Sequence, residues 1–299
     1  MKGSRRGGDA PRRFVMRGVL VGLAASALLI GMPATQTQAK GHDVSFVINA
    51  GSVYTNTVDV TLTLQAASVN LVRYKNAGGT FTAWEPYVVR RAWVLAPGDG
   101  LKTVEAVYRT TSGAIRTVSA PITLDTTAPV TTAPDAPEDW QRGPVTGHLN
   151  ASDALSGVAG TWYRVDGGPW TAGTTFTLCT WRRGGNSGVH LVEYYSADAA
   201  GNVEAVKHSE VMLDARAPVT TDDAPRATAS APVSVHLTAT DAHSGVATTW
   251  YRIDEASWTE GSSLVVEGPG LHWISYYSVD KAGNVENRHW RSVMITALP

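Results

Sequence analysis

Two copies of one long sequence pattern lie in this chain, and this internal repeat constrains its fold more than any other feature. Three blocks recur with their order and spacing preserved: DALSGVAGTWYRVDGGPWT (153–171) and DAHSGVATTWYRIDEASWT (241–259), HLVEYYSADAAGNVE (190–204) and HWISYYSVDKAGNVE (272–286), and LDTTAPVTT (124–132) and LDARAPVTT (213–221). Ordered blocks at similar offsets are the signature of a duplicated structural unit. We therefore predict two homologous modules, at residues 127–214 and 215–297.

A more divergent third copy occupies residues 43–126. TVDVTLTLQA (57–66) corresponds to PVSVHLTATD (232–241), and VEAVYRTTSGAI (104–115) aligns with VEYYSADAAGNV (192–203). The three modules have nearly equal lengths, and each is long enough to enclose one small hydrophobic core.

The modules show the residue pattern of β-strands. Every second residue of the segment 58–64 is Val or Leu and the residues between are polar, and the segment 233–239 repeats this alternation. Such a period of two is typical of strands that bury one face. Many short segments of this kind, interrupted by Gly and Pro, favour sandwiches. We predict an all-β chain of three tandem immunoglobulin-like β-sandwich modules that follow an N-terminal signal peptide.

Tyrosine pairs mark the strand before each AGN turn. Tyr195-Ser196-Ala197 and Tyr277-Ser278-Val279 stand where an antibody domain carries Tyr-x-Cys. We therefore expect Tyr195 and Tyr277 to be core tyrosines, with a small apolar residue in place of each half-cystine.

The one cysteine, Cys179, excludes an internal disulfide. We expect it to be buried in the strand FTLCTW, or alternatively to pair with another molecule.

The blocks TWYRVDGGPWT and VEYYSADAAGNVE, with their copies, resemble bacterial immunoglobulin-like and fibronectin-III-like tandem repeats, in particular the OmpL-type "β-barrel" extracellular repeat. The likeness covers nearly all of residues 43–297. It implies a stalk, a spacer, or an adhesive or sugar-binding attachment of secreted and surface proteins, and it assigns no ligand. The first module departs from the pattern, because Thr110 and Ala114 replace the Asp and Asn of the AGN turn.

The N-terminus has the pattern of an export signal. Residues 1–17 contain six basic residues and one acid, an apolar run follows at 18–32, and small residues lead to Ala39. This arrangement predicts a secretory signal peptide over residues 1–39 and a secreted or cell-surface protein with no membrane span after processing. An uncleaved anchor is the alternative. RRFVMR at 12–17 resembles a twin-arginine signal, so general secretion and twin-arginine export both stay open.

Charge and motif content exclude several functions. The formal net charge of −1 argues against nucleic-acid binding, which needs dense basic surfaces. The chain has no nucleophile elbow, phosphate-binding glycine loop or HExxH sequence. Because the sandwiches take up almost every residue, we expect no catalytic activity and no required cofactor.

Three tryptophans occupy matching places just after a central turn of each module, namely Trp84, Trp170 and Trp258. Their indole rings are candidates for contact with sugar rings. The alternative is that each ring caps the core of its own module.

Six aspartates are expected to meet at the module junctions. In an immunoglobulin-type sandwich the loops that carry these residues lie at one end, where the chain also enters the first strand. Oxygen ligands of this kind suit calcium. The alternative is that each Asp only accepts hydrogen bonds from its own turn. The two predicted groups are Asp125, Asp153 and Asp198, and Asp214, Asp241 and Asp280.

Taken together, the sequence predicts an exported, non-catalytic repeat protein that acts in cell-surface adhesion, structure or spacing. The alternative is an extracellular polysaccharide-binding protein that uses the tryptophan-bearing faces. The expected partner is a surface protein or a glycan.

Overall fold

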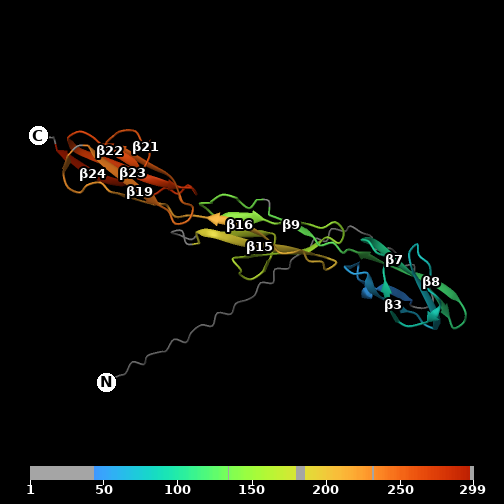
Figure 1. Ribbon diagram of the computed structural model, residues 1–299. Coiled ribbons are helices and arrows are strands. Elements are labelled where there is room, and N and C mark those ends of the chain that lie inside the picture. Colours follow the sequence, from blue (N-terminus) through green and yellow to red (C-terminus); the bar gives the residue numbers. More distant parts are fainter. Residues whose placement is uncertain (1–43, 134, 180–185, 231, 297–299) are drawn as a thin grey trace, which may run out of the picture. The chain divides into compact units, whose positions relative to one another are not determined.

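The computed structural model describes residues 44–133, 135–179, 186–230 and 232–296, and these are nearly all β-structure (Figure 1). The strands fall into three groups along the chain, which we call the first (β1–β8), second (β9–β16) and third (β17–β24) sandwich. Each has its own hydrophobic core. The all-β sandwich prediction is confirmed, whereas the predicted signal peptide at 1–39 lies outside the described residues. No apolar helix of membrane-spanning length occurs in the part of the chain that the structure describes.

The first sandwich has one sheet with the order β1-β3-β6 and a second with the order β2-β8-β7-β4-β5. A short 3₁₀ turn, Asn49–Gly51, separates β1 from β2, so that β1 pairs antiparallel with β3 and β2 pairs parallel with β8. The strands are β1 Ser45–Ile48, β2 Tyr54–Thr55, β3 Asp59–Gln65, β4 Val69–Asn76, β5 Glu85–Pro86, β6 Arg90–Val94, β7 Gly100–Thr110 and β8 Ile115–Leu124.

The second sandwich follows the same plan. The pairs β11-β9 and β10-β14 form one layer, and the four strands β13-β12-β15-β16 form the other. Its strands are β9 Val130–Thr132, β10 Val145–His148, β11 Asn150–Ser152, β12 Val158–Val165, β13 Thr171–Ala172, β14 Thr175–Leu178, β15 Gly188–Asp198 and β16 Lys207–Leu213.

The third sandwich has sheets with the orders β17-β19-β22 and β18-β24-β23-β20-β21. Its strand β18 pairs parallel with β24, as β2 pairs with β8 in the first sandwich. The strands are β17 Val219–Asp222, β18 Ala229–Ser230, β19 Val233–Thr240, β20 Val246–Ile253, β21 Thr259–Glu260, β22 Ser263–Val266, β23 Gly270–Asp280 and β24 His289–Thr296.

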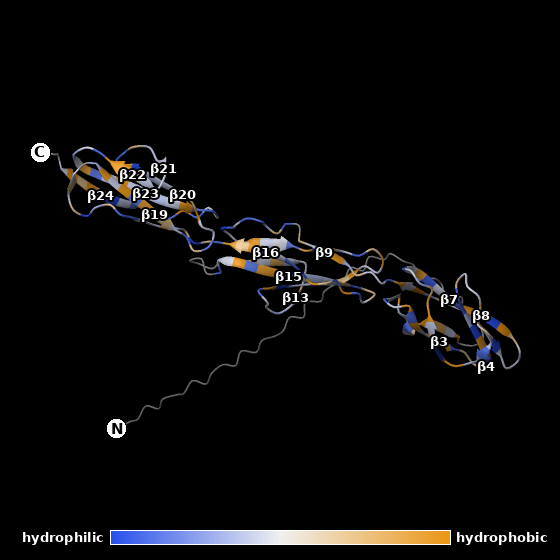
Figure 2. Ribbon diagram, in the orientation of Figure 1, coloured by the Kyte–Doolittle hydropathy of each residue, from blue (hydrophilic) through white to orange (hydrophobic). Residues whose placement is uncertain are grey.

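Alternation along the strands places the cores as the sequence predicts, and Figure 2 shows apolar and polar residues interspersed on the same strands. In β3 the residues Val60, Leu62 and Leu64 are buried, and in β19 Val233 and Val235 are buried. Side chains of a strand point alternately to opposite faces, so these residues enter the core while their neighbours meet solvent.

The prediction that Tyr195 and Tyr277 are core tyrosines is wrong by one residue. Tyr194 and Tyr276 are the buried members of each pair, whereas Tyr195 and Tyr277 are half-buried on the outer face. Because the side-chain period of a strand is two, a one-residue shift exchanges its two faces. The small residues Ala197 and Val279 accordingly also lie outside the core.

Buried polar residues connect the two layers where antibody domains have a disulfide. In the second sandwich the hydroxyl of Ser196 in β15 is 2.6 Å from that of Thr131 in β9 and 2.8 Å from that of Thr161 in β12. The carboxylate of Glu204 accepts hydrogen bonds from the backbone N–H groups of Thr131 and Ser196, and from the Thr131 hydroxyl. Lys207 adds an ion pair at 2.8 Å. This network closes the sandwich without a crosslink.

The third sandwich repeats this network. Glu286 accepts from the backbone N–H groups of Thr220 and Ser278 and from the Thr220 hydroxyl, and His289 replaces the lysine at 3.1 Å. Thr249 is 2.8 Å from Ser278. The recurrence of this hydrogen-bond network shows that the Glu of each AGNVE block is a structural residue.

Candidate metal centres

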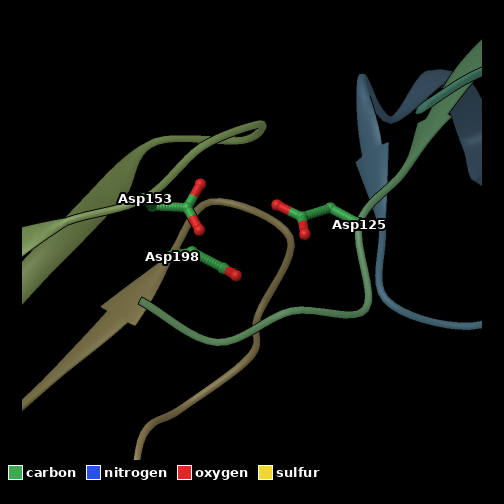
Figure 3. A group of neighbouring side chains, drawn as sticks. All are labelled: Asp125, Asp153 and Asp198. Atoms are coloured by element: carbon green, nitrogen blue, oxygen red, sulfur yellow. The ribbon is translucent and has the colours of Figure 1, made fainter. Parts of the chain in front are cut away.

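Three carboxylates meet where the linker after β8 reaches the second sandwich. Asp125 directly follows β8, Asp153 directly follows β11, and Asp198 is the last residue of β15. Each offers one oxygen, and these three oxygens all lie within 4.8 Å of one another. In Figure 3 the three side chains converge from three separate backbone segments. The structure therefore brings together the first predicted group of aspartates.

The oxygens of this cluster are held by backbone N–H groups. Asp125 accepts from Ser156 at 3.0 Å and from Thr127 at 3.1 Å. Asp153 Oδ1 accepts from the N–H groups of Leu155 and Gly157, at 3.1 and 2.7 Å. Such bonds hold each loop in shape and orient the carboxylates.

Asp198 is held by the AGN turn. Its Oδ1 accepts from the N–H groups of Gly201 and Asn202, and its Oδ2 accepts from the Asn202 side chain at 2.7 Å. The same amide donates to the backbone carbonyl of Asp125 at 2.8 Å. Asn202 thus ties the turn to the linker, which explains why the turn contains Asn beside Gly.

The second predicted group forms a cluster of the same kind. Asp214 follows β16, Asp241 follows β19, and Asp280 ends β23, with one oxygen of each within 4.8 Å of the others. Asn284 donates to Asp280 Oδ2 and to the carbonyl of Asp214, both at 2.8 Å. Ser244 donates its N–H and its hydroxyl to Asp214 Oδ2, at 3.0 and 2.6 Å. The two clusters therefore share one hydrogen-bond scheme.

Burial and charge make the clusters electrostatically unusual. Asp125 and Asp214 are 0% exposed, and Asp198 and Asp280 are also buried. Among the described residues, no Lys or Arg forms an ion pair with any of the six carboxylates. Burial acts to raise the pKa of Asp214, but hydrogen bonds, led by that from the Ser244 hydroxyl, hold this pKa below its usual value. Like charges this close repel unless a cation or good donors intervene.

The predicted tryptophans belong to neither aspartate cluster, and each lies outside the strands with an arginine over its ring. Trp84, Trp170 and Trp258 are half-buried. A guanidinium lies over each ring, at 4.7 Å for Arg73, 4.6 Å for Arg164 and 5.1 Å for Arg252. Trp170 and Trp258 also contact Tyr195 and Tyr277 edge-on. Sugar contact by these three rings stays a prediction.

The expectation of a buried Cys179 is wrong. Strand β14 ends at Leu178, and Cys179 lies beyond it with an exposed side chain. The segment FTLCTW was predicted as one strand, but β14 ends one residue before Cys179, so the cysteine has no buried strand position.

Four histidine–aspartate pairs among the described residues were not predicted from the sequence. The pairs His148–Asp135 and His236–Asp223 are equivalent, as are His190–Asp166 and His272–Asp254. The signal was present in the repeat, because each His and each Asp recurs in both copies. All four contacts join neighbouring segments of one sandwich, so they are structural ties.

No protein-family model and no curated protein sequence matches the chain. Solved structures with partial similarity include the fibronectin(III)-like modules of Clostridium thermocellum CbhA, at 14% identity and a TM-score of 0.36, covering 57% of this chain and 94% of that one. A 1.5-MDa bacterial ice-binding adhesin gives 16% identity and a TM-score of 0.39, covering 87% and 99%. The D00-D0 domain of intimin has 15% sequence identity and a TM-score of 0.33, and the match covers 56% of this chain and 100% of that one.

Proposed function

We propose that this chain is an exported, non-catalytic repeat protein that acts in cell-surface adhesion, structure or spacing, and that its two aspartate clusters bind calcium. The described residues are used almost entirely to build sandwiches. A shallow groove of the first sandwich is lined by residues such as Asp59, Asn76, Arg91 and Trp93, and its lining contains no His, Cys or Ser. Its lining therefore holds no Ser–His or Cys–His pair of the kind that serves as nucleophile and base in hydrolytic triads. Its partner is a surface protein or a glycan.

The duplication of the aspartate cluster is the observation that carries the calcium proposal. Both copies have the same three positions, the same burial pattern and the same Asn bond to the linker carbonyl. In the first sandwich the place of Asp198 is taken by Thr110, which accepts from the N–H of Ala114 through its hydroxyl. A turn of this shape therefore forms without a carboxylate. The aspartates at the two places where a linker enters a sandwich therefore have a role beyond shaping the turn.

Calcium suits the donor set. It takes six to eight oxygen ligands from carboxylates, carbonyls and water. The three aspartates supply carboxylate oxygens, and water would complete the shell. Binding would neutralise the buried negative charge and hold the linker against two loops of the sandwich that follows it. In this proposal calcium restricts bending of the linkers, as a spacer or an extended adhesin requires.

Calorimetric titration of CaCl₂ into the EDTA-treated full chain tests the proposal. We expect two equivalents of calcium to bind, one equivalent in either the Asp198→Asn or the Asp280→Asn variant, and none in the double variant. Asp223→Asn is the matched control, because Asp223 lies outside both clusters. Its exposed carboxylate also accepts a hydrogen bond from a backbone N–H group, that of His236, at 2.6 Å. Absence of binding heat at millimolar calcium, with unchanged small-angle scattering, would refute calcium binding and leave the turn-only role.

A further inference from the structure

An arginine of the third sandwich has lost the acidic partner that its counterpart has in the second. In the second sandwich Arg164 lies over Trp170 and forms two hydrogen bonds with Glu193, at 2.7 and 2.8 Å. This pair neutralises the guanidinium. The register of β12 and β15 places Arg164 directly opposite Glu193.

At the equivalent place in the third sandwich, Arg252 is opposite Ser275. The guanidinium still lies over a ring, that of Trp258, but its buried Nε has no hydrogen-bond partner among the described residues. A buried donor without a partner destabilises the folded state. Arg73 over Trp84 in the first sandwich likewise has a buried Nε without a partner among the described residues.

A second unpaired positive charge lies beside the first. The guanidinium of Arg288 is 5.4 Å from the centroid of the same Trp258 ring, where the second sandwich has Val206 at the corresponding position. Neither arginine forms an ion pair with an acid that the structure describes. Glu260, an acid of the neighbouring strand β21, is opposite Trp250 in the register and not opposite Arg252. Two cations on one indole ring repel each other and together attract an anion.

Exposed tryptophans extend this positive patch across the sheet. Trp273 in β23 is 50% exposed and Trp290 in β24 is 63% exposed. The register pairs Trp273 with Ser292 and Trp290 with Ser275, so the two tryptophans are diagonal neighbours on one face. Ser275 is also the residue opposite Arg252, which makes the aromatic and basic parts continuous.

The second sandwich shows that the fold does not require these residues. It has Leu191 and His208 at the places of Trp273 and Trp290 and forms the same sheet. The first sandwich also has two guanidiniums, of Arg73 and Arg109, over Trp84. No tryptophan is among its exposed large apolar residues in the described part of the chain. Basic and exposed aromatic groups occur together in the third sandwich.

We propose that the outer face of β20, β23 and β24 binds an anionic polysaccharide. Exposed indoles present flat apolar area to sugar rings. Guanidiniums bind carboxylate and similar oxyanion groups with paired hydrogen bonds. The surface comprises Arg252, Trp258, Trp273, Arg288 and Trp290, and an acid group of the sugar would supply the charge that Glu193 supplies in the second sandwich. This inference names the partner class of the proposed extracellular function and does not depend on calcium.

Affinity electrophoresis of the full chain in gels containing polygalacturonate, heparin or dextran, with EDTA throughout, tests the proposal. We expect retardation by the carboxylated or the sulfated polymer and none by neutral dextran, with the effect decreasing as salt rises. Because EDTA removes calcium, a failure of calcium binding would leave this result unchanged. No retardation by either anionic polymer, or equal retardation by dextran, would overturn the proposal.

Variants that install second-sandwich residues locate the site. Trp273→Leu with Trp290→His, and separately Arg288→Val, should each weaken retention at least tenfold while far-ultraviolet circular dichroism is unchanged. Ser275→Glu should abolish retention, because the new carboxylate pairs with Arg252 as Glu193 pairs with Arg164. Val189→Ala in the second sandwich is the control. Undiminished retention in these variants, or a dimer of the parent chain that Trp290→His dissociates, would overturn the proposal, the latter in favour of self-association.

Discussion

The buried Tyr276 offers a direct test of how the third sandwich is held together. Its hydroxyl donates to Asp222 Oδ2 at 2.7 Å, and Arg291 Nε donates to Asp222 Oδ1 at 2.8 Å. Burial, followed by this hydrogen bond, raises the pKa of Tyr276, so the hydroxyl stays protonated as a donor. The second sandwich has Ala133 and Ser209 at the places of the acid and the arginine, so Tyr194 lacks this partner.

Tyr276→Phe should therefore destabilise the third sandwich by the value of one charge-assisted hydrogen bond. Such a bond contributes about 1.5–3 kcal/mol, and the retained ring leaves no large cavity. For a unit of this size each kcal/mol shifts the melting temperature by roughly 4–8 °C, so a decrease of about 10 °C is expected. Tyr276→Ala, which also creates a cavity, should cost about 3–5 kcal/mol.

Differential scanning calorimetry of the full chain measures this change in the transition of the third sandwich. Tyr194→Phe is the matched control and should alter its own sandwich by less than about 0.5 kcal/mol. Equal losses in the two variants would show that the Asp222 bond contributes nothing. A larger loss from Tyr277→Phe would show that the outer tyrosine, and not Tyr276, stabilises the sandwich.

The pH dependence of the Tyr276→Phe effect supplies a second check. Burial acts to raise the pKa of Asp222, but the bonds from Arg291 and Tyr276 outweigh it and hold this pKa below its usual value. A depressed folded-state pKa contributes stability that is fully present above the unfolded value of about 3.9 and is lost as pH falls through the folded value. The difference between parent and variant should stay constant from pH 7 to pH 5 and shrink only in stronger acid.

Further predictions concern the cores and the paired histidines. Gly147→Val should destabilise the second sandwich strongly, because a Cβ there would collide with the Phe176 ring. Adding Phe176→Leu to this variant should restore melting, because the two residues then match the Val–Leu pair of the third sandwich. Glu286→Gln should lower the free energy of unfolding in urea by about 1–3 kcal/mol. The amide NH₂ of the new Gln would face backbone N–H groups that now donate to the Glu286 carboxylate. The hydrogen bond that the His272 ring donates to Asp254 is the main cause that raises the pKa of His272. The resulting stability is present below about pH 6.5 and lost as pH rises through the folded value, and Asp254→Asn should abolish this dependence in pH-scanned unfolding.

The sequence predicted the strands whose pattern is unambiguous. Val60, Leu62 and Leu64 alternate with polar residues, so one face alone can be buried. The strand β15 was harder, because Tyr194 and Tyr195 are adjacent and equally apolar. Its phase is determined by Ser196, whose hydroxyl needs Thr131 from a distant strand. A partner 65 residues away is not visible in a local pattern.

The aspartate clusters could be predicted because sandwich topology brings loops of one end together whatever their sequence. Asp153 and Asp198 follow from that topology, and Asp125 follows from the direction in which the linker arrives. The clamps formed by Asn202 and Asn284 could not be predicted, because an Asn beside Gly equally fits an isolated turn. Their bonds to the linker carbonyls depend on the path of a chain segment about 70 residues earlier in sequence.

The residues that differ between the second and third sandwiches behave differently in the core and on the outer face. Inside, substitutions compensate one another: Gly147 and Phe176 become Val235 and Leu264, which preserves the filling of one space. On the outer face they do not compensate, because Glu193 becomes Ser275 while Arg164 remains an arginine, and tryptophans take the places of Leu191 and His208. In the first sandwich Arg73 also has a buried Nε without a partner, but no tryptophan is among the exposed large apolar residues that the structure describes there. An uncompensated charge beside uncovered aromatic rings is what an external ligand would require, and this makes the outer face of the third sandwich the place to look for the partner of the chain.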